Sequence, residues 1–117
     1  LADTIPYQVR FYVTLDERVD ELYPYPNPSR GATDFTFRVL GATRPEQARL
    51  KIFTVAGRLL RELAVPASEL NIGFNRIRWD GRDAEGSELA TGVYFYNPVL
   101  PRGGRDEERT EKFAILR

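Results

Sequence analysis

The sequence predicts an all-β domain, an antiparallel β-sandwich of about seven strands, and three observations predict it. The chain has 117 residues, enough for one domain with a sizeable core, and it is 42% hydrophobic and 29% charged, as globular domains are. Its apolar residues recur at every second position, and no long stretch shows the 3.6-residue period of a helix. Short runs of this kind alternate with turns rich in glycine, proline and aspartate.

The first half of the chain contains three predicted strands and one rigid segment. Residues 7–15 alternate apolar and polar side chains, and residues 16–21 follow as an acidic connector, either a solvated turn or a linker from a preceding module. Residues 22–31 hold three prolines at alternate positions, which withhold N–H donors, so this segment is an edge or a rigid loop. Residues 34–40 and 49–55 alternate again and form two strands that each turn one face to the core.

The second half begins with a hairpin and ends with a strand. Glycine at the turn after Val55 tolerates positive φ, which favours a hairpin. The predicted elements are the turn at 56–58, a strand at 59–65, one helical turn at 67–71, a strand at 73–80 that carries Ile77 and Trp79 inward, a polar loop, a strand at 92–96, a polar loop at 98–110 and a final strand at 111–117.

Composition excludes several classes of function. Histidine and cysteine are both missing, which removes the usual general base, thiol nucleophiles, disulfides and the common nitrogen and sulfur metal ligands. The formal net charge is zero, so nothing indicates a nucleic-acid surface, and no apolar run approaches the roughly 20 residues that span a bilayer. Because no histidine can activate a serine or Thr91, we expect a protein that is not an enzyme. We also expect that it uses no cofactor and that the isolated domain is monomeric.

The loop from Asp80 to Glu88 carries four carboxylates and invites a calcium hypothesis. An EF-hand needs oxygen ligands at positions one, three and five and glycine at six. Counted from Asp80, those later positions are Arg82, Ala84 and Glu85, so the pattern fails. We expect a polar hairpin loop in which Asp80 accepts hydrogen bonds from nearby N–H groups, although a looser calcium site stays open.

Paired acids and tyrosines are the other candidates for a site. Adjacent carboxylates could serve glycoside hydrolysis, but these pairs lie on polar loops and are expected to be solvated. Aromatic rings at strand spacing could stack on carbohydrate, but they are more often core and edge packing. The residues concerned are the acid pairs Asp83 with Glu85 and Glu107 with Glu108, and the tyrosines Tyr23, Tyr25, Tyr94 and Tyr96.

Five motifs in a fixed order carry a family resemblance. They are Tyr25-Pro-Asn-Pro28 with Gly31, the hairpin from Leu50 to Leu60, the Trp79-Asp-Gly loop to Gly86, Gly92-Val-Tyr-Phe-Tyr96, and the last strand from Glu111 to Arg117. In this order the chain resembles the C-terminal sorting domains of the type IX secretion system, which are immunoglobulin-like sandwiches related to the Ig-like domain of the flagellar hook-capping protein. The resemblance covers residues 22–117 and implies that residues 1–21 are an N-terminal strand and connector or the end of a preceding module.

The resemblance also implies a function and a set of partner-recognition residues. Members of the family are recognised by an outer-membrane translocon or shuttle protein and are commonly cut off by a surface sortase, so export through the periplasm and outer membrane to the cell surface is expected. The strand at 73–80 with its Trp79 loop is closer to a variant that is retained, which leaves both fates open. The residues that match the motifs are Pro26, Asn27, Pro28, Gly57, Arg58, Gly92, Tyr94, Lys112, Phe113, Ile115, Leu116 and Arg117.

Two expectations accompany this interpretation. The last strand is expected to present a free, basic tip to a partner, and because the chain opens at Leu1 without methionine we expect a piece of a longer protein. Two rival functions stay open: an Ig-like spacer or assembly module similar to the hook cap, and a carbohydrate-binding sandwich that uses the tyrosines.

Overall fold

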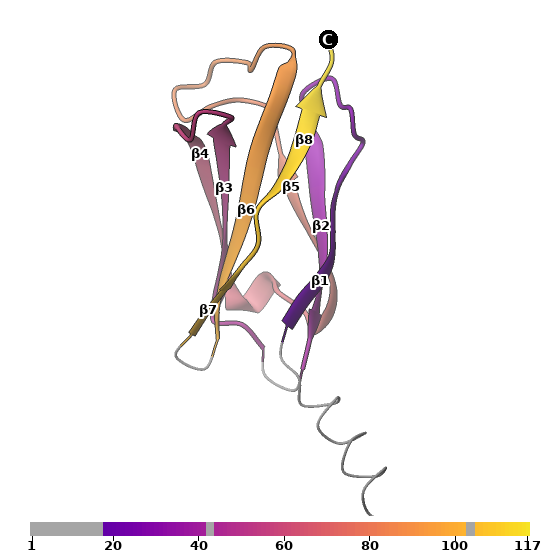
Figure 1. Ribbon diagram of the computed structural model, residues 1–117. Coiled ribbons are helices and arrows are strands. Elements are labelled where there is room, and N and C mark those ends of the chain that lie inside the picture. The colour runs from indigo at the N-terminus through magenta and orange to yellow at the C-terminus, as the bar shows by residue number, and fades with distance from the viewer. Residues whose placement is uncertain (1–17, 42–43, 103–104) are drawn as a thin grey trace, which may run out of the picture.

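Two antiparallel sheets face each other in the computed structural model, which describes residues 18–41, 44–102 and 105–117 and the side chains of 22–41, 44–101 and 109–117 (Figure 1). The three-stranded sheet has the order β1 (Arg18–Tyr25), β2 (Thr33–Leu40) and β5 (Gly73–Trp79). The strand predicted at 7–15 lies outside the described residues.

The second sheet has five strands, of which two share one position. Its order is β4 (Leu59–Pro66), β3 (Gln47–Thr54), β6 (Gly92–Arg102) and β7 (Arg105–Glu108), and β8 (Glu111–Ile115) also pairs with β6. β7 lies opposite the end of β6 and β8 opposite its beginning, so the two form one interrupted strand. The described chain therefore has seven strand positions, which confirms the predicted all-β sandwich.

A cluster of aromatic rings fills the space between the sheets. The period-two pattern buries Phe35 from β2 and Trp79 from β5, and Tyr96 and Phe113 meet them from the opposite sheet. The Phe113 ring stands edge-on to Phe35 at 5.2 Å and to Trp79 at 5.8 Å between ring centroids. Edge-to-face packing of this kind adds to the burial energy of each ring. The last strand is thus part of the core through Phe113 and Ile115.

Two predicted loops are strands in the structure. Residues 98–110 were expected to be a polar loop, but β6 continues to Arg102 and β7 follows. The prolines and charged residues of this stretch mask the alternating pattern of a hairpin. Val99 and Leu100 in this hairpin are buried. The interruption between β7 and β8 lies opposite Asn97 and Pro98, where proline withholds a ladder donor.

The acidic connector is the second correction. β1 begins at Arg18, so residues 18–21 are strand rather than a solvated turn. The pairing of β1 with β2 shifts register between Asp20 and Tyr23, and this bulge breaks the alternation by which the strand would have been recognised. The Leu59 strand, the hairpin turn before it and a 3₁₀ turn at Ala67–Glu69 are all confirmed. No helix among the described residues is long and apolar enough to cross a membrane.

Candidate functional site

The residues predicted to recognise a partner gather at one end of the sandwich (Figure 1). Tyr94 lies opposite Thr54 of β3 and opposite Phe113 of β8, so the turn after β3, the start of β6 and the end of β8 lie together. Ser29 forms a parallel bridge with Ile115, which places the turn at residues 26–31, called the proline turn, beside them. We call this region the motif end; it comprises residues 26–33, 55–59, 80–94 and 112–117.

The proline turn is hydrogen-bonded to the last strand. The side-chain oxygen of Asn27 accepts a hydrogen bond from the Ala114 N–H at 2.9 Å. The Ser29 N–H donates to the Ala114 carbonyl at 3.0 Å, and the Leu116 N–H donates to the Ser29 carbonyl at 2.8 Å. Because these bonds use the backbone from Ala114 to Leu116, at the end of β8 and just beyond it, this edge is occupied and cannot accept a further strand there.

The basic tip of the chain is not free, contrary to the expectation from sequence. The Arg117 guanidinium donates from Nε to the Leu89 carbonyl and from a terminal nitrogen to the Arg30 carbonyl, each at 2.7 Å. Its backbone N–H donates to Thr91 Oγ1 at 2.9 Å, and Glu88 lies 3.8 Å from the guanidinium. Five donors in a planar fork suit arginine to bind two carbonyls at once. Arg117 therefore ties two loops together.

Two glycines let these loops approach each other closely. Gly81 has a φ of +84°, and a Cβ placed on it would lie 2.6 Å from the carbonyl carbon of Gly31. No side chain larger than hydrogen fits at that contact. The Leu89 N–H also donates to the Gly81 carbonyl at 3.2 Å. The proline turn, the loop after Trp79 and the chain end thus form one connected unit.

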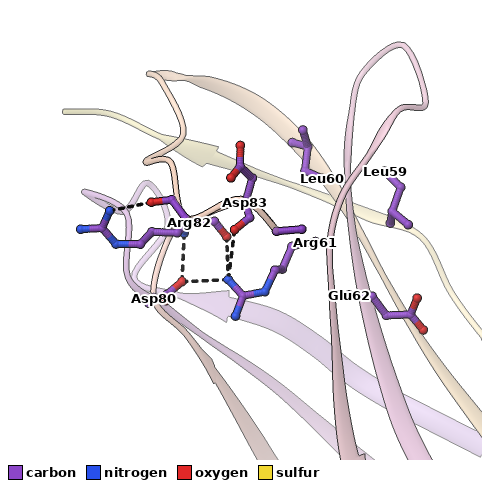
Figure 2. A pocket seen from close by; sticks show the side chains of 9 residues that line it. Leu59, Leu60, Arg61, Glu62, Asp80, Arg82 and Asp83 are labelled. Carbon is purple, nitrogen blue, oxygen red and sulfur yellow. Dashed lines mark hydrogen bonds and ion pairs between the residues drawn. The ribbon is translucent and has the colours of Figure 1, made fainter.

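The acidic loop after β5 is held by an arginine and by its own carboxylates (Figure 2). Arg61 of β4 donates from one guanidinium nitrogen to Asp80 Oδ1 at 3.3 Å and to the Arg82 carbonyl at 2.9 Å. Trp79 Nε1 donates to the same carbonyl at 2.9 Å. The expected bonds from loop N–H groups are present: Arg82 N–H donates to Asp80, and Asp83 accepts from two further N–H groups.

An open hollow of about 500 Å³ lies between this loop and the beginning of β4. Figure 2 shows Arg61 on its wall, turned toward Asp80 and the loop backbone. Leu59 and Glu62 come from the strand, and Asp83 from the loop. No group of three or more His, Cys, Asp or Glu within the described residues is placed to hold a metal ion. Asp80 and Asp83 accept hydrogen bonds from Arg61 and from N–H groups of the loop, so these two carboxylates stabilise the loop.

Two further motifs, Gly57 with Arg58 and Gly92 with Tyr94, belong to turns at the motif end. Gly57 has a φ of +93°, and Thr54 closes the hairpin by donating to the Arg58 carbonyl at 2.9 Å while its hydroxyl accepts from the Arg58 N–H at 3.0 Å. Tyr94 donates from its hydroxyl to the Ala90 carbonyl at 2.7 Å, with its ring over Gly92. Gly57 and Gly92 therefore shape the motif end, and the Arg58 side chain is exposed beside it.

The four tyrosines do not form one surface. Tyr96 is fully buried in the core, where desolvation raises the pKa of its hydroxyl, and Tyr94 is half-buried. Only Tyr23 and Tyr25 are exposed, both on β1 at the edge of the three-stranded sheet. The expectation of core packing is confirmed for Tyr96, which belongs to the core cluster, and for Tyr94, which packs against it. Glu107 and Glu108 belong to β7, in which side chains lie outside the described part.

Asp34 pairs with two arginines on the outer face of the three-stranded sheet. Arg78 Nε lies 2.9 Å from Asp34 Oδ1, and Arg76 lies 3.9 Å from the other oxygen. The hydrogen bond from Arg78 lowers the pKa of Asp34, against a smaller opposing effect of desolvation. The same contact raises the pKa of Arg78. Because Arg78 is mostly exposed, this pair fixes side-chain positions more than it stabilises the fold.

Three residues important to the motif end escaped the sequence analysis. Arg61 follows Leu60 in a predicted strand, and its inward position arises from a bulge at Ile52 and Phe53 that no pattern revealed. Ser29 is buried at 1% exposure although it lies in a proline turn. The sequence shows Gly81 only as a turn glycine, because its contact with Gly31 depends on tertiary structure. The Asn-Pro-Ser order was the one available signal, since serine and asparagine commonly bond to local backbone.

The fold and the connected loops define the chain as an immunoglobulin-like β-sandwich domain. Its structure is similar to part of the crystal structure of dimeric latent PorU from Porphyromonas gingivalis, a type IX secretion system protein, with a TM-score of 0.68 and 23% identity. The match covers 86% of this chain and 9% of that one, so the chain corresponds to a small part of PorU.

The structure is also similar to the crystal structure of FlgD from Xanthomonas campestris, a protein of hook capping in flagellar assembly. The TM-score is 0.53 at 24% identity, and the match covers 92% of this chain and 73% of that one. No family model matches the sequence, and no curated protein matches it either. The two neighbours are the two kinds of protein that the motif order resembles, and they confirm that resemblance at the level of the fold.

Proposed function

We propose that this chain is a non-catalytic C-terminal sorting domain that directs an exported parent protein through the type IX secretion system. The observation that carries the proposal is the gathering of all five family motifs at one end of a sandwich whose fold is shared with part of PorU. Its partners are an outer-membrane translocon or shuttle protein and a surface sortase, and its destination is the cell surface or the medium.

A reporter fusion tests this function. A signal peptide, a folded reporter and this chain at the C-terminus are expressed in a bacterium with an intact type IX system and in the same strain without its translocon. We expect the reporter outside the first strain and in the periplasm of the second. A reporter without the chain controls for leakage. Equal retention of the fusion in both strains would contradict the proposal.

The likeness to FlgD supports a second candidate, an Ig-like spacer or assembly module, because the match extends over most of both chains. The two candidates differ in their dependence on position. A sorting domain acts at the end of a chain, whereas a spacer works between other domains. Moving the chain between the signal peptide and the reporter should abolish export under the first candidate and leave the location unchanged under the second.

A further inference from the structure

The free edge of β4 is a place where a further strand could join the five-stranded sheet. Among the described strands β4 pairs only with β3, so one side of its backbone faces away from the sheet. Such an edge is a template for pairing with another chain. The bulge in β4 adds to this exposure, because Leu60 is the extra residue between the pairs that Leu59 and Arg61 form with β3. A bulged residue is left out of the ladder, so its backbone groups need partners elsewhere.

The acidic loop at residues 80–88, which we call the strap, supplies such a partner. The Ala84 N–H donates to the Leu60 carbonyl at 2.9 Å, so the strap lies against the beginning of the β4 edge. The strap is closed by its own hydrogen bonds. The Asp83 N–H donates to the Ser87 carbonyl at 2.9 Å, and the Asp83 carboxylate accepts from the Ser87 N–H at 2.9 Å. It therefore covers the edge as a preformed unit.

Two side chains hold the strap in this position (Figure 2). Trp79 Nε1 donates to the Arg82 carbonyl at 2.9 Å, which fixes the base of the strap to the end of β5. Arg61 belongs to β4 itself, and one of its guanidinium nitrogens donates to the same carbonyl at 2.9 Å and to Asp80 Oδ1 at 3.3 Å. Charge-assisted bonds of this kind are stronger than neutral ones. Arg61 is thus the side chain that ties the strap to the strand it covers.

The rest of the β4 edge is protected by its own residues. Glu62 is exposed near the middle of the strand, and the strand ends at the exposed Pro66. A charge and a proline both disfavour the addition of a strand, because the charge would be desolvated or repelled and proline has no N–H to donate. The strap covers the beginning of the strand, which these two residues do not protect.

We propose that the strap is a cover that keeps β4 from pairing, and that its release lets β4 pair antiparallel with β4 of a second copy of this chain. A second copy fits because one antiparallel strand edge can pair with itself about a two-fold axis, which is the symmetry of most dimers. The expected monomer therefore depends on the bonds that Arg61 makes. This inference is independent of the proposed function.

Hydrogen exchange of the Ala84 N–H measures how often the strap opens. Arg61→Ala removes the guanidinium bonds to the strap, so this exchange rate should rise roughly 10- to 100-fold. Arg58→Ala is the matched control: it removes the same charge just before β4, but the bonds of Arg58 to Thr54 are made by its backbone, so the rate should not change. An unchanged rate in Arg61→Ala would overturn the role given to Arg61.

Sedimentation velocity then measures pairing. The wild type should be monomeric at concentrations at which Arg61→Ala forms dimers. Adding Ala64→Glu should restore the monomer while the exchange of the Ala84 N–H stays fast. In a two-fold pair of β4 strands this carboxylate would lie opposite Glu62 or its own copy, and like charges opposite each other are destabilising. Within its own sheet it lies opposite Arg49, which favours the fold.

Each outcome bears on one step of the proposal. A monomeric Arg61→Ala variant with fast exchange would show that the strap does not prevent pairing and would overturn the proposal. Dimers that persist with Ala64→Glu would overturn pairing through β4. Urea unfolding followed by the fluorescence of Trp79 verifies that each variant is folded. If Arg61→Ala does not fold, Arg61→Lys keeps the charge without the planar geometry of the guanidinium, and its exchange and sedimentation decide in the same way.

Discussion

Alanine at Gly81 should destabilise the domain far more than alanine at Gly86, although the two glycines have nearly the same backbone conformation. Their φ angles are +84° and +87°. Around Gly86 an added Cβ would meet nothing within 4 Å. At Gly81 it would lie 2.6 Å from the carbonyl carbon of Gly31 and 2.8 Å from its Cα. The pair thus separates backbone strain from steric contact.

The expected magnitudes follow from these two effects. Positive φ costs a residue with a Cβ about 1 to 2 kcal/mol, which is the whole expected loss for Gly86→Ala. Overpacking adds about 1 to 3 kcal/mol at Gly81, since the opposing atoms are backbone and cannot rotate away. Gly31 is further held by its N–H, which donates to Ser29 Oγ at 3.2 Å. We therefore expect a loss of about 3 to 4 kcal/mol for Gly81→Ala.

Urea unfolding measures this difference directly. The single tryptophan, Trp79, is buried beside the loop and reports the transition by fluorescence. Gly57→Ala is a second control, because Gly57 also has positive φ with open space around it. The three free energies of unfolding, taken at equal m-values, should place Gly81→Ala about 2 kcal/mol below both controls. Equal losses at all three positions would refute the contact between Gly31 and Gly81.

Three further predictions concern other parts of the domain. Arg117→Ala should lower stability by about 2 kcal/mol through two lost charge-assisted hydrogen bonds, and Arg117→Lys should recover less than half of this; an unchanged urea midpoint for Arg117→Ala would contradict its role as a tie. Phe113→Ala should cost about 3 to 5 kcal/mol because it removes the central ring of the core, and a loss below about 1 kcal/mol would mean that β8 is peripheral. The pKa of Asp34 is lowered from its ordinary 3.8, so its contribution to stability is complete above pH 3.8 and disappears as the pH falls through the lowered folded pKa. Below pH 3.8 Asp34→Asn should therefore lose less stability than the wild type, and parallel curves would contradict the pairing with Arg78.

The sandwich could be predicted because its signals are local. Alternation placed Phe35 and Trp79 inward, and glycine with proline marked most turns, so most core and strand positions follow from periodicity. The prediction failed for strands that form because a neighbouring strand pairs with them and not because of their own sequence pattern. β7 has four charged residues and no apolar alternation, and it is a strand because β6 provides a ladder beside it.

The candidate site was predicted in its membership but not in its geometry. The motif residues do lie together, yet no spacing could tell that Arg117 reaches the carbonyls of Leu89 and Arg30, since 28 and 87 positions separate these partners in the chain. The outward-facing positions on β3 and β6 were equally hidden. Phe53 and Phe95 alternate with core residues, and only the register shows that they face away from them on neighbouring strands.

The hydrogen bonds at the chain end affect how a sorting partner could recognise this domain. Asn27, Ser29 and Arg117 occupy the backbone and the tip of the last strand, so a partner that needed this strand as a free peptide would first have to break these hydrogen bonds. Deleting residues 112–117 would also remove Phe113 from the core, and lost export would then report unfolding rather than a lost contact. Under the proposed function, recognition is therefore of a folded surface, and point substitutions on exposed positions such as Val93 are the variants that can reveal it.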